Sequence, residues 1–258
     1  MANILAIHAH PDDAEILAGG TLALLAGLGH QITIATFTPG DCGSKELGPE
    51  EIAAVRRQEA ANAAALIGAS YICLEMRDLA VFPDDASRRR VTEALRQARP
   101  DLVLTASPVD YHCDHEAAGA LVRDACFGAP APNYDTRSAA PAPPLPRIPH
   151  LYFMDPAEGR DRDGRVVEPD FVVDVAAAFV RKRAMLAEHA SQREWLRQHH
   201  GMDNYLDEME RWTRRRGELV GVEYGEGFRQ CKGHAYPQSG LLEELLGDNA
   251  ILRPRAAC

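Results

Sequence analysis

The chain has 258 residues, of which 46% are hydrophobic and 6% aromatic, so it is long enough to bury a substantial core as one large domain or two small ones. Its net charge of −10 argues against nucleic acid or an anionic membrane as the main partner. No apolar run approaches the roughly 18 residues of a membrane span. The N-terminus lacks the pattern of a secretory signal, and six scattered cysteines without a CxxC pair predict free thiols. We therefore expect a cytoplasmic protein.

Strand and helix patterns alternate through the first half of the chain. Short apolar or β-branched runs predict strands over 3–9, 31–38, 71–76 and 101–106. Helical patterns with acidic first turns or Gly stops lie between and after them, over 15–29, 49–68, 86–99 and 116–129. Because parallel neighbours need crossover connections, this alternation predicts a Rossmann-like, mostly parallel α/β sheet with helices on both faces.

The composition changes after residue 127. Residues 128–149 are rich in Pro and Ala and predict a long loop, whereas 150–155 and 171–175 again have strand patterns. The segments 176–200 and 207–228 predict a mainly helical C-terminal extension. We expect one domain over 1–258, with a core over 1–127, the loop over 128–149 and the remaining strands and helices over 150–258.

Two clusters of acids and histidines follow predicted strands. "HPDD" (10–13) follows the first strand, and "HCDH" (112–115) follows the strand over 101–106. In an open parallel sheet, ligands bind beyond the carboxyl ends of the strands, so the two clusters are expected to converge. Imidazole and carboxylate are usual zinc ligands, and two His with one Asp would leave an open position for catalysis.

Parts of this pattern also occur in proteins without a metal site. Asp13 as a helix N-cap, with His112 and His115 exposed to solvent, would make the clusters ordinary loops. That interpretation is weakened because both clusters occur at equivalent strand ends. A dinucleotide-binding turn is also weakly supported, since Gly19 and Gly20 lie inside the predicted helix and no GxGxxG occurs.

The motifs "AHPDDAE" and "HCDH", together with "VRRQEAANAAALIGA" and "VGVEYGEGF", resemble the PIG-L/LmbE-like family of zinc-dependent N-deacetylases. The resemblance extends over nearly the whole chain and is closest to the bacillithiol-biosynthesis type, which acts on a GlcNAc-malate conjugate. It implies Zn²⁺, with Fe²⁺ as the alternative in the cell, and a homo-oligomer, trimeric or hexameric. The family commonly has Pro where this chain has Cys113, and the tail also differs, which leaves the exact substrate open.

The resemblance also implies residue roles. The zinc ligands would be His10, Asp13 and His115. Asp12 would be the general base, and a protonated His112 would stabilise the oxyanion with Asp114 as its orienting partner. Arg56 would contact the substrate, although a solvated helix arginine is nearly as plausible from sequence, and His234 would either line the pocket or lie on a loop.

These residues predict a hydrolase that removes acetyl from an N-acetylated amino sugar or glycoside by attack of metal-activated water. One alternative keeps the site and changes the bond, giving a zinc amidase that acts on a thiol conjugate or another acyl amide. The other is a non-catalytic, metal-stabilised domain that binds a sugar or nucleotide. Asp12 argues against the last, because binding alone needs no base beside the metal.

Overall fold

A mixed sheet runs through the centre of the molecule. The computed structural model describes residues 1–193, 205–247 and 251–252, and in these residues the sheet has eight strands in the order β3-β2-β1-β4-β5-β7-β6-β8. The strands are β1 (Asn3–His8), β2 (Gln31–Thr36), β3 (Ser70–Cys73), β4 (Leu102–Thr105), β5 (His150–Met154), β6 (Phe171–Asp174), β7 (Gly225–Gln230) and β8 (Ile251–Leu252). The five neighbouring strands β3, β2, β1, β4 and β5 pair in parallel, as predicted. The pairings of β7 with β5 and of β6 with β7 and β8 are antiparallel.

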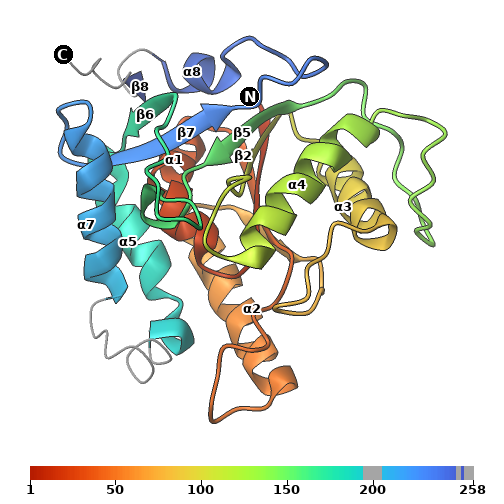
Figure 1. The fold of residues 1–258 in the computed structure, drawn as a ribbon, viewed down its shortest axis with the longest axis horizontal. Helices are drawn as coiled ribbons and strands as arrows, with labels where there is room; N and C mark the ends of the chain where they lie inside the picture. The colour runs from red at the N-terminus through yellow and green to blue at the C-terminus, as the bar shows by residue number, and fades with distance from the viewer. Residues whose placement is uncertain (194–204, 248–250, 253–258) are drawn as a thin grey trace.

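Helices cover both faces of the sheet (Figure 1). The helices are α1 (Asp13–Gly27), α2 (Pro49–Ala65), α3 (Asp85–Ala98), α4 (Cys113–Gly128), α5 (Phe179–Ala187), α7 (Tyr205–Glu218) and α8 (Leu241–Leu246), with short 3₁₀ turns at Ala157–Gly159 and Ala176–Ala178. α1, α5, α7 and α8 share one hydrophobic core with the sheet, and α3 and α4 form a second core on the opposite face. None of the described helices has both the length and the apolar character needed to cross a membrane.

The first strand shows why both faces are covered. Ile4 and Ala6 belong to one core, while Leu5 and Ile7 belong to the other, and all four are buried. Side chains alternate across a strand, so a continuous apolar run supplies both layers at once. The chain proceeds from β1 to β2 and β3 on one side and returns to β4 and β5 on the other. The carboxyl ends of β1 and β4 therefore meet at a point where the strand order reverses.

The C-terminal half is less helical than the sequence predicts. Residues 205–218 form the expected helix α7, but the predicted helix does not continue to residue 228, because 225–230 form strand β7 between β5 and β6. The predicted helix over 176–200 is interrupted after α5 and resumes at Ala190; its part over 194–200 lies outside the described residues.

The Pro/Ala-rich segment contains no helix or strand over 129–149. It is held against α3, because the Glu93 carboxylate accepts hydrogen bonds from Thr136 Oγ1 at 2.6 Å and the Ala142 amide at 2.8 Å. The described cysteines are free thiols, as expected, and Cys258 lies outside the described residues.

α1 is tied to the C-terminal half by a buried ion pair. Lys182 Nζ lies 2.6 Å from Glu226 Oε1 and donates to the Ile16 carbonyl at 2.7 Å. The Glu226 carboxylate also accepts hydrogen bonds from the amides of Gly20 and Thr21, each at 2.8 Å. Gly20 also lets the Val175 side chain pack closely against α1, since a Cβ at position 20 would lie 2.6 Å from Val175 Cβ. These contacts fix the helix whose first residue is Asp13.

Candidate metal centre and catalytic site

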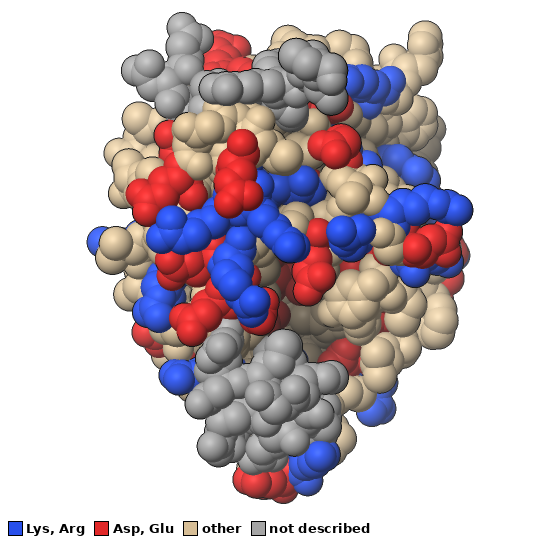
Figure 2. All heavy atoms as spheres, turned by 60° about the vertical axis from the view of Figure 1, so that its left-hand side comes forward, with Lys and Arg blue, Asp and Glu red and all other residues tan. Residues whose placement is uncertain are grey.

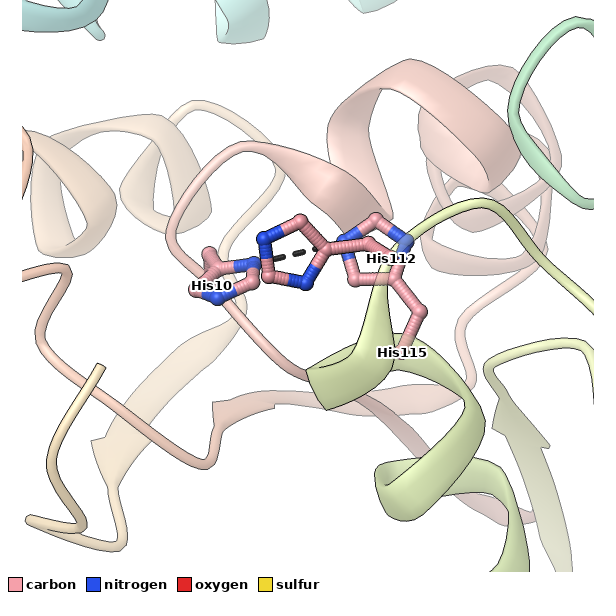
Figure 3. Close-up of side chains that lie close together, drawn as sticks. All are labelled: His10, His112 and His115. Atoms are coloured by element: carbon pink, nitrogen blue, oxygen red, sulfur yellow. Dashed lines mark hydrogen bonds between the residues drawn. The ribbon is translucent and has the colours of Figure 1, made fainter. Parts of the chain in front are cut away.

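The two predicted clusters converge at the carboxyl ends of β1 and β4. His10 lies in the turn between β1 and α1, and His112 and His115 lie at the start of α4 (Figure 3). His112 is the N-cap of α4, where its Nδ1 accepts a hydrogen bond from the Asp114 amide at 3.2 Å. His115, one turn into the helix, is buried and faces His10, with its Nε2 3.3 Å from His10 Nδ1.

Three side chains, two imidazoles and one carboxylate, bring potential ligand atoms to nearly equal distances from one another, with each Asp13 oxygen facing a different histidine. His10 Nδ1 is 3.3 Å from Asp13 Oδ2, His115 Nε2 is 3.4 Å from Asp13 Oδ1, and the two histidine nitrogens are 3.3 Å apart. Tetrahedral zinc with bonds of about 2.0–2.1 Å to N and O ligands separates those ligands by about 3.3–3.4 Å. The donor set and its spacing therefore fit a zinc ion, and the same donors suit Fe²⁺.

Each of these three groups has a supporting partner behind it. His115 Nδ1 lies 3.2 Å from Asp110, and His8 Nδ1 lies 2.6 Å from Asp13 Oδ2. His10 Nε2 lies 3.0 Å from Asp78 and 3.3 Å from Asp114. Carboxylates behind metal-binding histidines commonly fix the ring orientation and the tautomer.

The carboxylate of Asp114 has a different partner from the one that the sequence suggests. It accepts hydrogen bonds from the amides of Leu79 at 2.7 Å and Val81 at 3.3 Å, and it faces His10. His112 instead contacts the Asp114 backbone amide. The reason is the N-cap geometry: His112 takes the amide at the helix start, which leaves the Asp114 carboxylate to the neighbouring loop.

The carboxylates give the site a strong preference for positive charge. Burial alone lowers the pKa of His10, but the adjacent Asp114, Asp13 and Asp78 raise it well above its usual value. Burial likewise opposes ionisation of Asp13, yet the neighbouring His115 and His8 hold its pKa well below the usual range. Buried acids persist in this way only when cations compensate them.

Asp12 lies in this site on a strained backbone. It is the N-cap of α1 with φ of 100°, a left-handed conformation that is unfavourable for a residue with a Cβ, and its side chain makes no capping bond. Its carboxylate accepts a hydrogen bond from the Tyr205 hydroxyl at 2.5 Å and lies 3.8 Å from Arg56. Burial raises the pKa of Asp12, although the Arg56 guanidinium acts in the opposite direction.

A cavity of 510 Å³ opens over these groups, within the range of about 300–1,000 Å³ typical of small-molecule sites. We call it the site cavity. It is lined by His10, Asp12, Asp13, Ile16, Cys42, Gly43, Arg56, Asp78, Leu79, Tyr111, His112, His115, Glu158, Gln192 and Tyr205. On the face of the molecule that carries α7, basic and acidic side chains are mixed (Figure 2).

The two predicted substrate-binding residues lie in different places. Arg56 lines the site cavity but is buried, and it donates to the carbonyls of Pro11 at 2.8 Å and Gly40 at 3.3 Å. It is therefore not a solvated helix arginine. His234 is exposed on the segment after β7 and is absent from the lining of the site cavity.

Several residues of the site were not singled out from sequence. Asp78 and Asp110 each follow a strand, so the rule that located the two clusters applies to them as well. Tyr205 and Gln192 reach the cavity from the C-terminal half, and no motif or strand end marks either of them.

Proteins similar to this chain include deacetylases and a hydratase. The model of the family described as PIG-L, GlcNAc-PI de-N-acetylase, matches residues 5–126, which include both clusters. A 4-oxalmesaconate hydratase from Pseudomonas putida is 27% identical over 73% of this chain and 73% of its own. A probable N-acetyl-alpha-D-glucosaminyl L-malate deacetylase 2 from Bacillus cereus is 26% identical over 74% of this chain and 84% of its own. The N,N'-diacetylchitobiose deacetylase structure from Pyrococcus horikoshii has a TM-score of 0.76 and 26% identity, and covers 93% of this chain and 89% of that one.

Proposed function

We propose that this chain, which belongs to the PIG-L/LmbE-like family of deacetylases, is a metal-dependent hydrolase that removes the N-acetyl group from an N-acetylglucosamine-type sugar or glycoside. The observation that carries the proposal is the joint geometry of four residues. The two ligand nitrogens of His10 and His115 lie 3.3 Å apart, each lies within 3.4 Å of one oxygen of the Asp13 carboxylate, and Asp12 adjoins them in the same cavity. Named relatives that deacetylate GlcNAc derivatives support the substrate class.

The metal would be held by His10 Nδ1, the Asp13 carboxylate and His115 Nε2. Zinc bound by three protein ligands would supply a water with a pKa of about 7 and polarise a carbonyl. The remaining acids orient this set: Asp110 holds His115, and Asp78 and Asp114 hold His10.

Asp12 is the proposed proton carrier. Its carboxylate takes the proton of the attacking water and passes it to the departing amine, which leaves as the free amino sugar while acetate forms. Burial favours this exchange, because it raises the pKa of Asp12 towards the working range of a general base. Tyr205 and Arg56 contact the carboxylate and fix its direction.

His112 is the proposed oxyanion donor. Its Nδ1 accepts the Asp114 amide hydrogen, which leaves the proton of a neutral ring on Nε2. Burial lowers the pKa of His112, and the neighbouring His10 and His115 lower it further. A neutral Nε2–H can donate to the oxyanion without carrying a full charge, and one such donor typically contributes about 3 kcal/mol to the barrier reduction.

The test is acetate release by zinc-loaded protein from a panel of N-acetylglucosaminides, including N,N'-diacetylchitobiose and a GlcNAc-malate conjugate. Asp12→Asn should lower kcat by roughly 10²–10⁴-fold, the usual contribution of a general base, without loss of metal. Asp163→Asn, which alters an exposed acid outside the site cavity, is the control. Acetate release by Asp12→Asn at the parental rate would remove Asp12 from the mechanism.

A hydratase is the second candidate, because a hydratase is among the relatives. The same residues that deprotonate water for attack on an amide could do so for addition to a carbon–carbon double bond. The panel therefore includes 4-oxalmesaconate, followed by its absorbance. Turnover of that compound without acetate release from any glucosaminide would replace the deacetylase proposal by the hydratase.

A further inference from the structure

The entrance of the site cavity exposes large apolar side chains. Tyr111 is 66% exposed and Leu79 is 59% exposed, and both line the cavity. The Tyr111 ring packs edge-on against His112 and His115, with ring centroids 5.7 Å apart in each case. Leu79 is held outward in a left-handed conformation with φ of 61°, because its amide donates to Asp114 Oδ2. An apolar surface held in this way at a cavity entrance is typical of a ligand contact.

The charged groups of the site cavity are mostly acidic. Its lining includes the carboxylates of Asp12, Asp13, Asp78 and Glu158, of which Asp13 would be offset by the metal and Glu158 is the exposed one. Among the lining residues that the structure describes, Arg56 is the one permanent cation.

Arg56 is already engaged by the protein. Its two terminal nitrogens donate to the Gly40 and Pro11 carbonyls, and it faces Asp12. The guanidinium is therefore held by the loops that it joins and by the proposed base, rather than directed to the entrance.

An exposed acid lines the cavity together with Tyr111. This acid is Glu158, which lies in the short 3₁₀ turn Ala157–Gly159. An anionic aglycone at this entrance would face the Glu158 carboxylate, and such like-charge juxtaposition costs several kcal/mol in general.

We infer that the site cavity selects an uncharged saccharide aglycone, seated on Tyr111 and Leu79, over an anionic one. The inference rests on the proposed deacetylase function and specifies its substrate class. The aromatic face of Tyr111 suits the apolar face of a sugar ring, and the exposed carboxylate of Glu158 can accept hydrogen bonds from sugar hydroxyls. A malate aglycone offers neither match, since its carboxylates need cations.

The effect of the charge of the aglycone is tested with two substrates that share one carbon skeleton. The GlcNAc-malate conjugate and its dimethyl ester differ only in the two carboxylates, and kcat/KM for acetate release should be at least about tenfold higher for the ester. Glu158→Lys should reduce this ratio to less than about threefold, because it replaces an acid at the entrance by a cation. Glu223→Gln, an exposed acid outside the cavity, should leave the ratio unchanged. Equal or faster turnover of the free acid by the parent overturns the inference.

The platform formed by Tyr111 is tested with a disaccharide and a monosaccharide. Tyr111→Ala should raise KM for N,N'-diacetylchitobiose by about tenfold, whereas Tyr111→Phe, which keeps the ring, should stay within about twofold of the parent. The effect on free N-acetylglucosamine should be smaller, because it has no second ring to seat. An equal effect of Tyr111→Ala on both sugars, or an effect of Tyr111→Phe as large as that of Tyr111→Ala, would contradict the platform.

Different results would remove the deacetylase activity and the aglycone preference. Absence of acetate release from every glucosaminide by zinc-loaded protein removes the deacetylase proposal itself. Acetate release from all of them, without preference for the ester, leaves the deacetylase intact and removes only the selection of an uncharged aglycone.

Discussion

The parallel and antiparallel parts of the sheet contribute to the site in different ways. The parallel part, β3-β2-β1-β4-β5, ends in the turns that hold the three candidate ligands His10, Asp13 and His115. The antiparallel part, β7-β6-β8, with α5 and α7, contributes no candidate ligand among the described residues and instead packs behind α1. Candidate ligands therefore come from strand ends, and support comes from the later half of the chain.

The support is specific as well as apolar. Glu226 on β7 and Lys182 on α5 bind backbone groups in the middle of α1, and Tyr205 at the start of α7 binds Asp12 at its N-terminus. Because α1 is held both in its middle and at its N-terminus, the turn between β1 and α1 is held in place as well. If this division is correct, changes in the two halves should have separable effects on metal binding and on stability.

The largest expected effect is on a candidate ligand in the parallel half. Asp13→Ala should lower zinc affinity by roughly a thousandfold, since about 10–16 kcal/mol of binding free energy in typical zinc sites is shared among a few ligands. Elemental analysis after gel filtration should show about one zinc per chain in the parent and almost none in the variant. His234→Ala, on the exposed segment after β7, is the control. Full zinc content in Asp13→Ala would exclude Asp13 as a ligand.

The next effect concerns the buried pair in the C-terminal half. Lys182→Met should lower the free energy of unfolding by about 3–5 kcal/mol, because it leaves the Glu226 carboxylate buried without its cation. Urea unfolding of the metal-free protein measures this loss. The double variant Lys182→Met/Glu226→Gln should be more stable than Lys182→Met alone. A loss below about 1 kcal/mol in Lys182→Met would show that the pair does not hold α1.

The parallel half could be predicted from sequence because its signals are local. Alternation of strands and helices fixes the layers, and the rule that ligands bind beyond strand ends places His10 near His115 without any knowledge of side-chain packing. The same rule would also have found Asp78 and Asp110, which lie after β3 and β4.

The antiparallel half depends on contacts between distant segments. Strand β7 contains Gly225 and Gly227, which are poor strand formers, and its sequence predicts helix instead. The glycines are needed for close approach: a Cβ on Gly225 would lie 2.6 Å from Val172 Cγ1, and one on Gly227 would contact Asp155. Tyr205 was missed for a similar reason, since only tertiary packing brings it to Asp12.

Asp155, where the two halves meet, should make stability depend on pH. It follows β5 and pairs with Arg216 of α7, and burial raises its pKa to about 6 despite that arginine. Because the folded pKa exceeds the usual 3.8, the native state holds more protons between these values, and stability falls as pH rises through this window. The free energy of unfolding of the parent relative to Asp155→Asn should decrease by about 2 kcal/mol from pH 4.5 to 7.5. A difference that does not change with pH would contradict the raised pKa.

The last expected effect, on kcat rather than on stability, concerns the contact that joins the two halves. Tyr205→Phe removes the hydroxyl that donates to Asp12 and keeps the ring in the core, so it should change the direction of the carboxylate without unfolding α7. Losing one hydrogen bond to a charged group typically costs about 1.5–3 kcal/mol, which corresponds to a decrease in kcat of roughly 10–100-fold. Zinc content and KM should stay near the parental values, because Tyr205 contacts no candidate ligand in the described structure. Tyr236→Phe is the matched control, since it removes a hydroxyl that donates to the Arg123 carbonyl away from the cavity. Equal kcat for the two variants would mean that the C-terminal half supports the site only through packing, and the orientation of Asp12 would then be set by its own strained turn.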